Sequence, residues 1–183
     1  MAKLKIYTDG ACSNNQNDTN AGGWGAILEW GDVQKELYGG EANTTNNKME
    51  MTALIEALSC LKRTGLEIDV FSDSSYLMDC FRKKWYVKWQ KNGWVNSAKE
   101  PVKNKDLWEQ LLDLTSQHNI HFFKVKGHVD VSKDSSDLKK RYQKFTENNG
   151  SSFTYDDFIY ITKMNNRADE LANIGMEPYK NNA

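Results

Sequence analysis

The sequence predicts an α/β fold in which a mixed five-stranded sheet is flanked by helices. Two observations support this class. Three segments of β type come first in the chain, and strand and helix patterns alternate after them, which is typical of a sheet covered by helices. The chain has 183 residues, of which 39% are apolar, enough for one core. We therefore expect a single domain spanning residues 1–183, and we find no internal repeat.

Six segments in the first half of the chain have regular patterns. Gly31 and Asp32, between the second and third strand segments, are typical of a hairpin turn. The first helical segment has an apolar stripe that includes Leu54, Leu58 and Leu61. The predicted elements are strands at 3–9, 22–31, 33–41 and 68–73 and helices at 46–63 and 74–84.

The second half of the chain is less regular. Asn104 is placed to cap a helix whose apolar residues share one face. A strand at 120–128 and a helix at 166–176 follow. Between them, residues 129–164 form a connection too long for plain loop in a compact domain, so we interpret them as a partly helical insertion. Thr154 begins a short capped helix within this insertion.

Four acidic residues stand where the predicted fold gathers polar groups at one edge of the sheet. Asp9 and Asp73 each end a predicted strand, and neighbouring parallel strands place their carboxyl ends together. Glu50 shares a face with the apolar stripe of its helix, and Asp169 borders the apolar face of the last helix. Each acid also has a structural interpretation: a turn or cap for the first two, a capping box with Asn47 for Glu50, and a solvated first-turn acid for Asp169.

Taken together, the four acids predict a metal site. Carboxylates that converge at one buried edge cannot all stay ionised without counter-charge. Oxygen donors without a histidine–cysteine set suit Mg²⁺, with Mn²⁺ as a substitute. Two such ions, about 3.5–4 Å apart, are the usual device for phosphodiester hydrolysis.

Basic residues are concentrated in one segment although the net charge of the chain is only −1. Residues 82–105 contain eight lysines or arginines and one acid, a net charge of +7 that leaves −8 for the rest. Such a block predicts a polyanionic partner. Tryptophans alternate with the lysines and are expected to contact bases or sugars, or alternatively to form the core of a helical hairpin. The residues concerned are Lys84, Trp85, Lys88, Trp89, Lys91 and Trp94.

The chain resembles the type 1 ribonuclease H family, the cellular enzymes that cut RNA in RNA–DNA hybrids. Six motifs occur in the family's order: YTDGAC, TTNNKMEMTALIEAL, SDSSYL, KNKDLW, VKGH and NNRADELA. The resemblance covers residues 1–128 and 165–176. It implies an endonuclease that uses two Mg²⁺ ions and leaves 5′-phosphate and 3′-hydroxyl ends. The implied catalytic residues are four metal-binding acids, Asp9, Glu50, Asp73 and Asp169, and His128, which assists proton transfer and product release from a mobile loop.

The resemblance also implies residues that contact the hybrid. A 2′-hydroxyl is both a hydrogen-bond donor and an acceptor. Thr45, Asn46 and Asn47 of the TTNN motif are therefore suited to bind it. The first loop is longer than in the family, and either Asn14 or Asn15 takes its backbone-binding role, with Asn15 as our candidate. The segment 82–103 is similar to the family's basic protrusion, which favours a stand-alone enzyme.

The insertion at 129–164 is where the chain departs most from the family. One interpretation is a tolerated surface insertion, because long loops cost little in closure entropy. The other is a lid that positions His128 and adds phosphate contacts.

The remaining features limit the location and class of the protein. No apolar run approaches the ~20 residues of a membrane helix, and the start of the chain has no apolar signal region, so we expect a cytoplasmic monomer that does not bind membranes. The three cysteines have no zinc-type spacing and are expected to be free thiols.

Two other functions are alternatives to a hybrid-cutting enzyme. A non-catalytic hybrid-binding module would have a broken acid set, whereas all four acids are present. Another nuclease of the superfamily would lack TTNN and the protrusion; the sequence has both.

Overall fold

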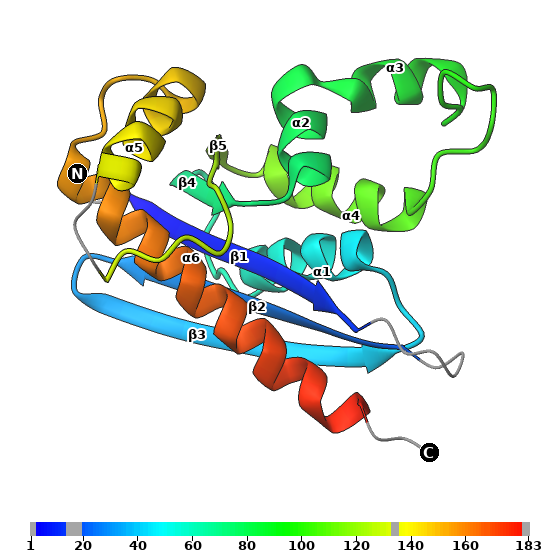
Figure 1. Cartoon of the computed structure of the whole chain (residues 1–183). Helices are drawn as coiled ribbons and strands as arrows, with labels where there is room; N and C mark the ends of the chain where they lie inside the picture. The colour runs from blue at the N-terminus through cyan, green and yellow to red at the C-terminus, as the bar shows by residue number, and fades with distance from the viewer. Residues whose placement is uncertain (1–2, 14–19, 133–135, 181–183) are drawn as a thin grey trace.

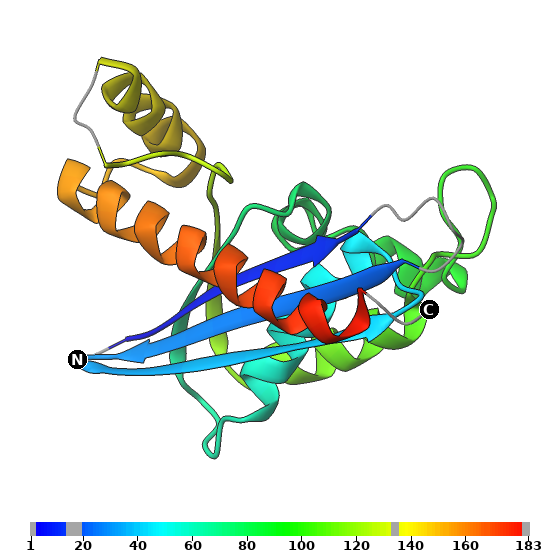
Figure 2. The ribbon, with the colours of Figure 1, turned by 60° about the horizontal axis from the view of Figure 1, so that its bottom comes forward.

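The computed structural model describes residues 3–13, 20–132 and 136–180 (Figures 1 and 2). Its sheet has five strands in the order β3-β2-β1-β4-β5. The first three strands pair antiparallel, whereas β4 pairs parallel with both β1 and β5, so the predicted mixed sheet is confirmed. The strands are β1 (Leu4–Cys12), β2 (Ala21–Trp30), β3 (Val33–Ala42), β4 (Glu67–Ser72) and β5 (Asn119–Lys124).

Helices cover both faces of this sheet (Figure 1). Successive residues of a strand point to opposite faces. On β1, Ile6 therefore packs in a first core with α1, α2 and α4, and Tyr7 packs in a second core with α5 and α6. Figure 2 shows α6 crossing the strands β1, β2 and β3. The helices are α1 (Asn46–Ser59), α2 (Ser75–Lys83), α3 (Trp85–Asn92), α4 (Lys105–Ser116), α5 (Ser136–Asn149) and α6 (Tyr155–Met176), followed by a short 3₁₀ helix, η1 (Glu177–Tyr179).

Two helix starts differ from the sequence prediction. The hydroxyl of Thr45 caps α1 by accepting a hydrogen bond from the amide of Lys48, at 3.1 Å, so Asn47 is not the cap. Asn104 precedes α4 as predicted, but its backbone is left-handed (φ 61°) and its side chain makes no capping bond. A capping residue usually has an extended backbone, which Thr45 has and Asn104 lacks.

The fifth strand and the last helix also have different lengths from those predicted. β5 ends at Lys124 and not at His128, because the chain turns away there and His128 adopts a left-handed backbone with φ 58°. The predicted short helix from Thr154 and the predicted helix at 166–176 are one continuous helix of 22 residues, α6. Thr154 does cap it, in a capping box with Asp157.

The segment predicted as an insertion is therefore largely helical. It contains α5 and the first turns of α6. Leu138 and Phe145 of α5 are buried in the second core, as are Phe158 and Ile161 of α6. A short β5–α6 connection would lack these four side chains, so the segment contributes directly to the core.

Candidate active site

The register of the parallel strands brings two of the predicted acids together. Thr8 of β1 pairs with Ser72 of β4, so Asp9 and Asp73, the next residue of each chain segment, meet at the same edge of the sheet. Glu50 reaches this edge from α1. Asp9, Glu50 and Asp73 each offer a ligand oxygen, and these oxygens lie within 4.8 Å of one another.

Close packing of α1 on β1 positions Glu50. A Cβ at Gly10 would lie 2.6 Å from the backbone nitrogen of Glu50, so only glycine allows this approach. Asp9 and Glu50 are each 3% exposed. The Oε2 atom of Glu50 is buried and has no hydrogen-bond partner among the described residues.

The electrostatics of the cluster are unfavourable without a cation. Burial, followed by the charges of Glu50 and Asp73, raises the pKa of Asp9 far above its usual range. Burial and then the charge of Asp73 raise the pKa of Glu50, and burial also raises the pKa of Asp73. Hydrogen bonding with Asp9 and the charge of His128 oppose the rise in the pKa of Asp73, but the net shift is still upward.

His128 and Asp169 lie beside the three clustered acids. The Nδ1 atom of His128 is 3.7 Å from Oδ2 of Asp169, and their side chains are 76% and 27% exposed. The charge of Asp169 is among the causes that raise the pKa values of Glu50 and Asp73, although Asp169 is outside the tight group of three. The structure thus brings all five predicted catalytic residues to one region.

The cluster fits a hard divalent cation. Its donors are carboxylate oxygens, which Mg²⁺ and Mn²⁺ prefer, and the unpartnered oxygen of Glu50 is free to ligate. Gly127 lies directly over the Asp73 carboxylate, where a side chain would collide with Oδ2. The sequence of this loop therefore keeps space open at the carboxylates.

A cavity of about 380 Å³ opens onto the acids. Asn46 and Asn47, predicted as substrate contacts, line it together with His128. Thr45 is exposed next to them and also caps α1. Asn14 and Asn15 lie outside the described residues.

Sequence reasoning missed Tyr76 as part of this cavity. Its hydroxyl accepts a hydrogen bond of 2.9 Å from Nε1 of Trp108, which fixes the ring at the start of α2. The only signal in the sequence was its position three residues after Asp73. A residue at this position can reach the cavity only if the helix begins directly after Asp73, and α2 does begin at Ser75.

The basic segment separates into exposed lysines and partly buried tryptophans. Lys84, Lys88 and Lys91 are all exposed on or beside α3. Trp89 and Trp94 are half-buried against the first core, and the Trp89 ring lies 5.8 Å from that of Trp108. Trp85 is 37% exposed, which leaves its ring the most accessible of the three.

Comparison with known proteins gives consistent matches. The RNase H family model matches residues 1–151. A protein named Ribonuclease H from Symbiobacterium thermophilum is 49% identical over 135 residues, covering 74% of this chain and 89% of the relative. One of the same name from Acetivibrio thermocellus is 53% identical over 130 residues, covering 71% and 86%. Asp169 lies beyond the family match, so its assignment depends on the structure and the short NNRADELA motif.

Solved structures share the fold. LC9-RNase H1, a type 1 RNase H with the type 2 active-site motif, has a TM-score of 0.70 at 21% identity, covering 98% of this chain and 74% of that one. LC11-RNase H1, solved in complex with an RNA/DNA hybrid, has a TM-score of 0.58 at 19% identity, covering 96% and 98%. At these identities the likeness concerns the fold. No helix in the described part of the chain has both the length and the apolar content to cross a membrane.

Proposed function

This chain belongs to the ribonuclease H family, and from that premise we propose that it is an endonuclease that hydrolyses the RNA strand of RNA–DNA hybrids. The observation that carries the proposal is the group formed by the buried Asp9 and Glu50 and the half-buried Asp73. Three converging carboxylates at a sheet edge destabilise the protein unless a cation neutralises them, so they are explained by function and not by packing.

We propose that Asp9, Glu50, Asp73 and Asp169 hold two Mg²⁺ ions, for which Mn²⁺ can substitute. When bound, the ions supply positive charge that activates a water and stabilises the leaving oxygen. The chain's carboxylates fix the place of that charge at the strand ends. Hydrolysis adds the elements of water across the P–O3′ bond, which leaves a 5′-phosphate and a 3′-hydroxyl.

His128 is suited to move a proton in this reaction. Its side chain is exposed, so it can exchange protons with solvent, and its Nδ1 atom lies 3.7 Å from Oδ2 of Asp169. We propose that it assists proton transfer and product release. Asn46 and Asn47 line the same cavity and are the proposed 2′-hydroxyl contacts, together with Thr45 and, in the preceding loop, Asn15.

Metal binding can be tested by stability, without measuring cleavage. The raised pKa values of Asp9, Glu50 and Asp73 mean that the folded apo protein holds protons more tightly than the unfolded chain. The contribution of these three groups to stability is therefore greatest below the unfolded carboxyl pKa of about 4, and it falls as the pH rises toward the folded values. At pH 8, Mg²⁺ should reverse this loss and raise Tm by several degrees, since saturation at about 100 Kd adds ~2.7 kcal/mol.

Asp9→Asn supplies the comparison for this experiment. It should have a higher apo Tm than wild type at pH 8, because an amide avoids the free-energy cost of burying a carboxylate or of keeping it protonated, and it should show a smaller Mg²⁺ shift. Thermal unfolding followed by circular dichroism measures both. An equal Mg²⁺ shift in the two proteins would show that the cluster is not the metal site.

We propose that the exposed lysines of α3 bind backbone phosphates, as a basic protrusion at residues 82–103 of a single domain. The triple change Lys84→Glu, Lys88→Glu and Lys91→Glu should weaken hybrid binding. It should also make the negative slope of log K against log salt less steep, by roughly 0.9 for each phosphate that the variant no longer binds. Fluorescence anisotropy at several salt concentrations measures both.

A control with the same charge change is Lys35→Glu, Lys62→Glu and Lys163→Glu, at exposed sites on other elements. It should alter binding much less, through net charge alone. Equal slopes in the two triple variants would contradict a specific role for α3.

Trp85, the most exposed ring, is the proposed stacking partner. Trp89 and Trp94 are proposed as secondary contacts because their rings are partly occupied by the core.

We further propose that the enzyme acts as a monomer in the cytoplasm. The three cysteines, Cys12, Cys60 and Cys80, are free thiols, which suits a reducing compartment.

A further inference from the structure

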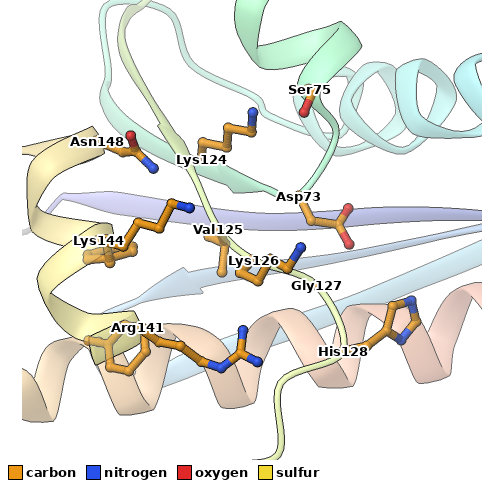
Figure 3. A pocket seen from close by; sticks show the side chains of 12 residues that line it. Asp73, Ser75, Lys124, Val125, Lys126, Gly127, His128, Arg141, Lys144 and Asn148 are labelled. Carbon is orange, nitrogen blue, oxygen red and sulfur yellow. The ribbon is translucent and has the colours of Figure 1, made fainter. Parts of the chain in front are cut away.

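A second cavity, of about 500 Å³, continues from the carboxylates toward α5 (Figure 3). Asp73 and His128 line this cavity as well as the first one. Its far wall is α5, in the segment between the VKGH and NNRADELA motifs. We call it the α5 pocket and define it by Lys124, Lys126, Arg141, Lys144, Asn148 and the apolar floor described below.

Four cationic side chains from two elements converge on the α5 pocket. Lys124 and Lys126 come from the end of β5 and the segment after it, and Arg141 and Lys144 come from α5 (Figure 3). Arg141 has an acidic partner, Asp137, at 2.9 Å. Lys124, Lys126 and Lys144 form no salt bridge in the part of the chain that the structure describes. Asp73 is the carboxylate that lines the pocket beside these four cationic side chains, so the lining carries net positive charge next to the acidic site.

The floor of the pocket is apolar. Val125, Phe145 and Phe158 line it, and all three are buried in the second core. A wall of low polarity reduces screening and strengthens the attraction of an anion to the lysines above it.

The wall of the pocket is fixed to the sheet before any ligand binds. The side chain of Asn149, at the end of α5, pairs with the backbone of Lys124: its Oδ1 accepts from the amide at 3.0 Å, and its Nδ2 donates to the carbonyl at 2.8 Å. Arg82 of α2 donates to the carbonyl of Asn148 and to Oδ1 of Asn149. These bonds set the position of Lys144 relative to Lys124, so little ordering is needed on binding.

We propose that the α5 pocket binds a backbone phosphate of the RNA strand, within a few nucleotides of the cleaved bond. The proposal rests on the proposed function, because that function places the RNA strand at Asp73. A strand lying on Asp73 and beside His128 enters the α5 pocket as it continues, since the same two residues line both cavities. The pocket thus adds a substrate contact supplied by the segment between β5 and α6.

The test uses the double change Lys124→Gln and Lys144→Gln. Glutamine is one atom shorter than lysine, but it keeps hydrogen-bonding capacity and removes the charge. The matched control is Lys139→Gln on α5 with Lys163→Gln on α6, which are exposed and do not line the pocket. Hybrid binding is measured in an Asp9→Asn background, where cleavage does not consume the ligand. The pocket variant should bind the hybrid about tenfold more weakly, and its negative slope of log K against log salt should be less steep by roughly 0.9. The control should keep the affinity and the slope of the parent.

Single neutral methylphosphonates, placed one at a time along each strand, locate the contact. At one RNA position near the cut, the neutral linkage should weaken binding to the Asp9→Asn protein but have no further effect on the pocket variant. The proposal is overturned if no RNA position behaves in this way, if a DNA position does so instead, or if inorganic phosphate competes equally with the pocket variant and the parent. Because these readouts are binding constants, they remain interpretable even if the wild-type protein does not cleave hybrids.

Discussion

Asp73→Asn is expected to abolish cleavage of an RNA–DNA hybrid while leaving the fold intact. Asp73 follows β4, lies against Asp9 across the parallel register, and is the one carboxylate that lines both cavities. An amide keeps the shape of the side chain but removes the negative charge that holds a cation. The loss should reach at least the ~10²–10³-fold typical of removing one preorganised electrostatic group.

The measurement is the initial rate on a labelled hybrid at saturating Mg²⁺, with circular dichroism to confirm folding. Asp113→Asn, an exposed aspartate on α4, makes the same chemical change away from the site and should keep the wild-type rate. A wild-type rate for Asp73→Asn would contradict the assignment of this carboxylate to the catalytic metal site.

Phe145→Ala is expected to cost about 3–5 kcal/mol of unfolding free energy, the range for an aromatic residue removed from a packed core. Phe145 is 5% exposed, and its ring lies 5.3 Å from that of Phe153 and 5.4 Å from that of Phe158. The change leaves a cavity between α5 and α6. It should also weaken hybrid binding, because Lys144, the preceding residue, loses its fixed position.

Urea unfolding at equilibrium measures the stability of this variant. Glu147→Ala, on the exposed side of α5, is the control and should change stability by less than ~0.5 kcal/mol. A loss below ~1 kcal/mol for Phe145→Ala would show that α5 is a tolerated surface insertion.

The core of the site could be predicted because local patterns determine it. Asp73 directly follows β4, as predicted, but β1 continues past Asp9 to Cys12, and only its pairing with β4 stops before Asp9. The helical period places Glu50 on the face toward the sheet. These arguments need only one assumption about long-range structure, that β1 and β4 are parallel neighbours, and the register confirms it.

The continuity of α6 could not be predicted because polar residues interrupt its apolar stripe. Thr162 and Asn165 are each 1% exposed, yet they read as surface or loop residues in a sequence. Thr162 donates to the carbonyl of Phe158, so its hydroxyl is satisfied within the helix. Asn166, beside them, donates to the carbonyl of Val129 and ties α6 to the loop that carries His128.

One interpretation of the sequence assigns phosphate contacts to the insertion, but the residues that form the α5 pocket could not be predicted from it. Its lysines come from β5 and α5, and their proximity depends on the pairing of Asn149 with the backbone of Lys124. A hydrogen bond between one side chain and a distant backbone leaves no periodic pattern. The tryptophans of the protrusion illustrate the same limit, because Trp89 packs on Trp108 of a later helix and Trp94 packs on Trp89.

Cleavage of three duplexes of one sequence, an RNA–DNA hybrid, double-stranded RNA and double-stranded DNA, tests the central proposal most directly. Wild-type protein with Mg²⁺ should cut only the RNA strand of the hybrid, at internal positions, and the fragments should carry 5′-phosphate and 3′-hydroxyl ends. Asp73→Asn should cut none of the three. Cutting of either of the other duplexes at a rate similar to that for the hybrid, or intact RNA in the hybrid, would contradict the proposed function.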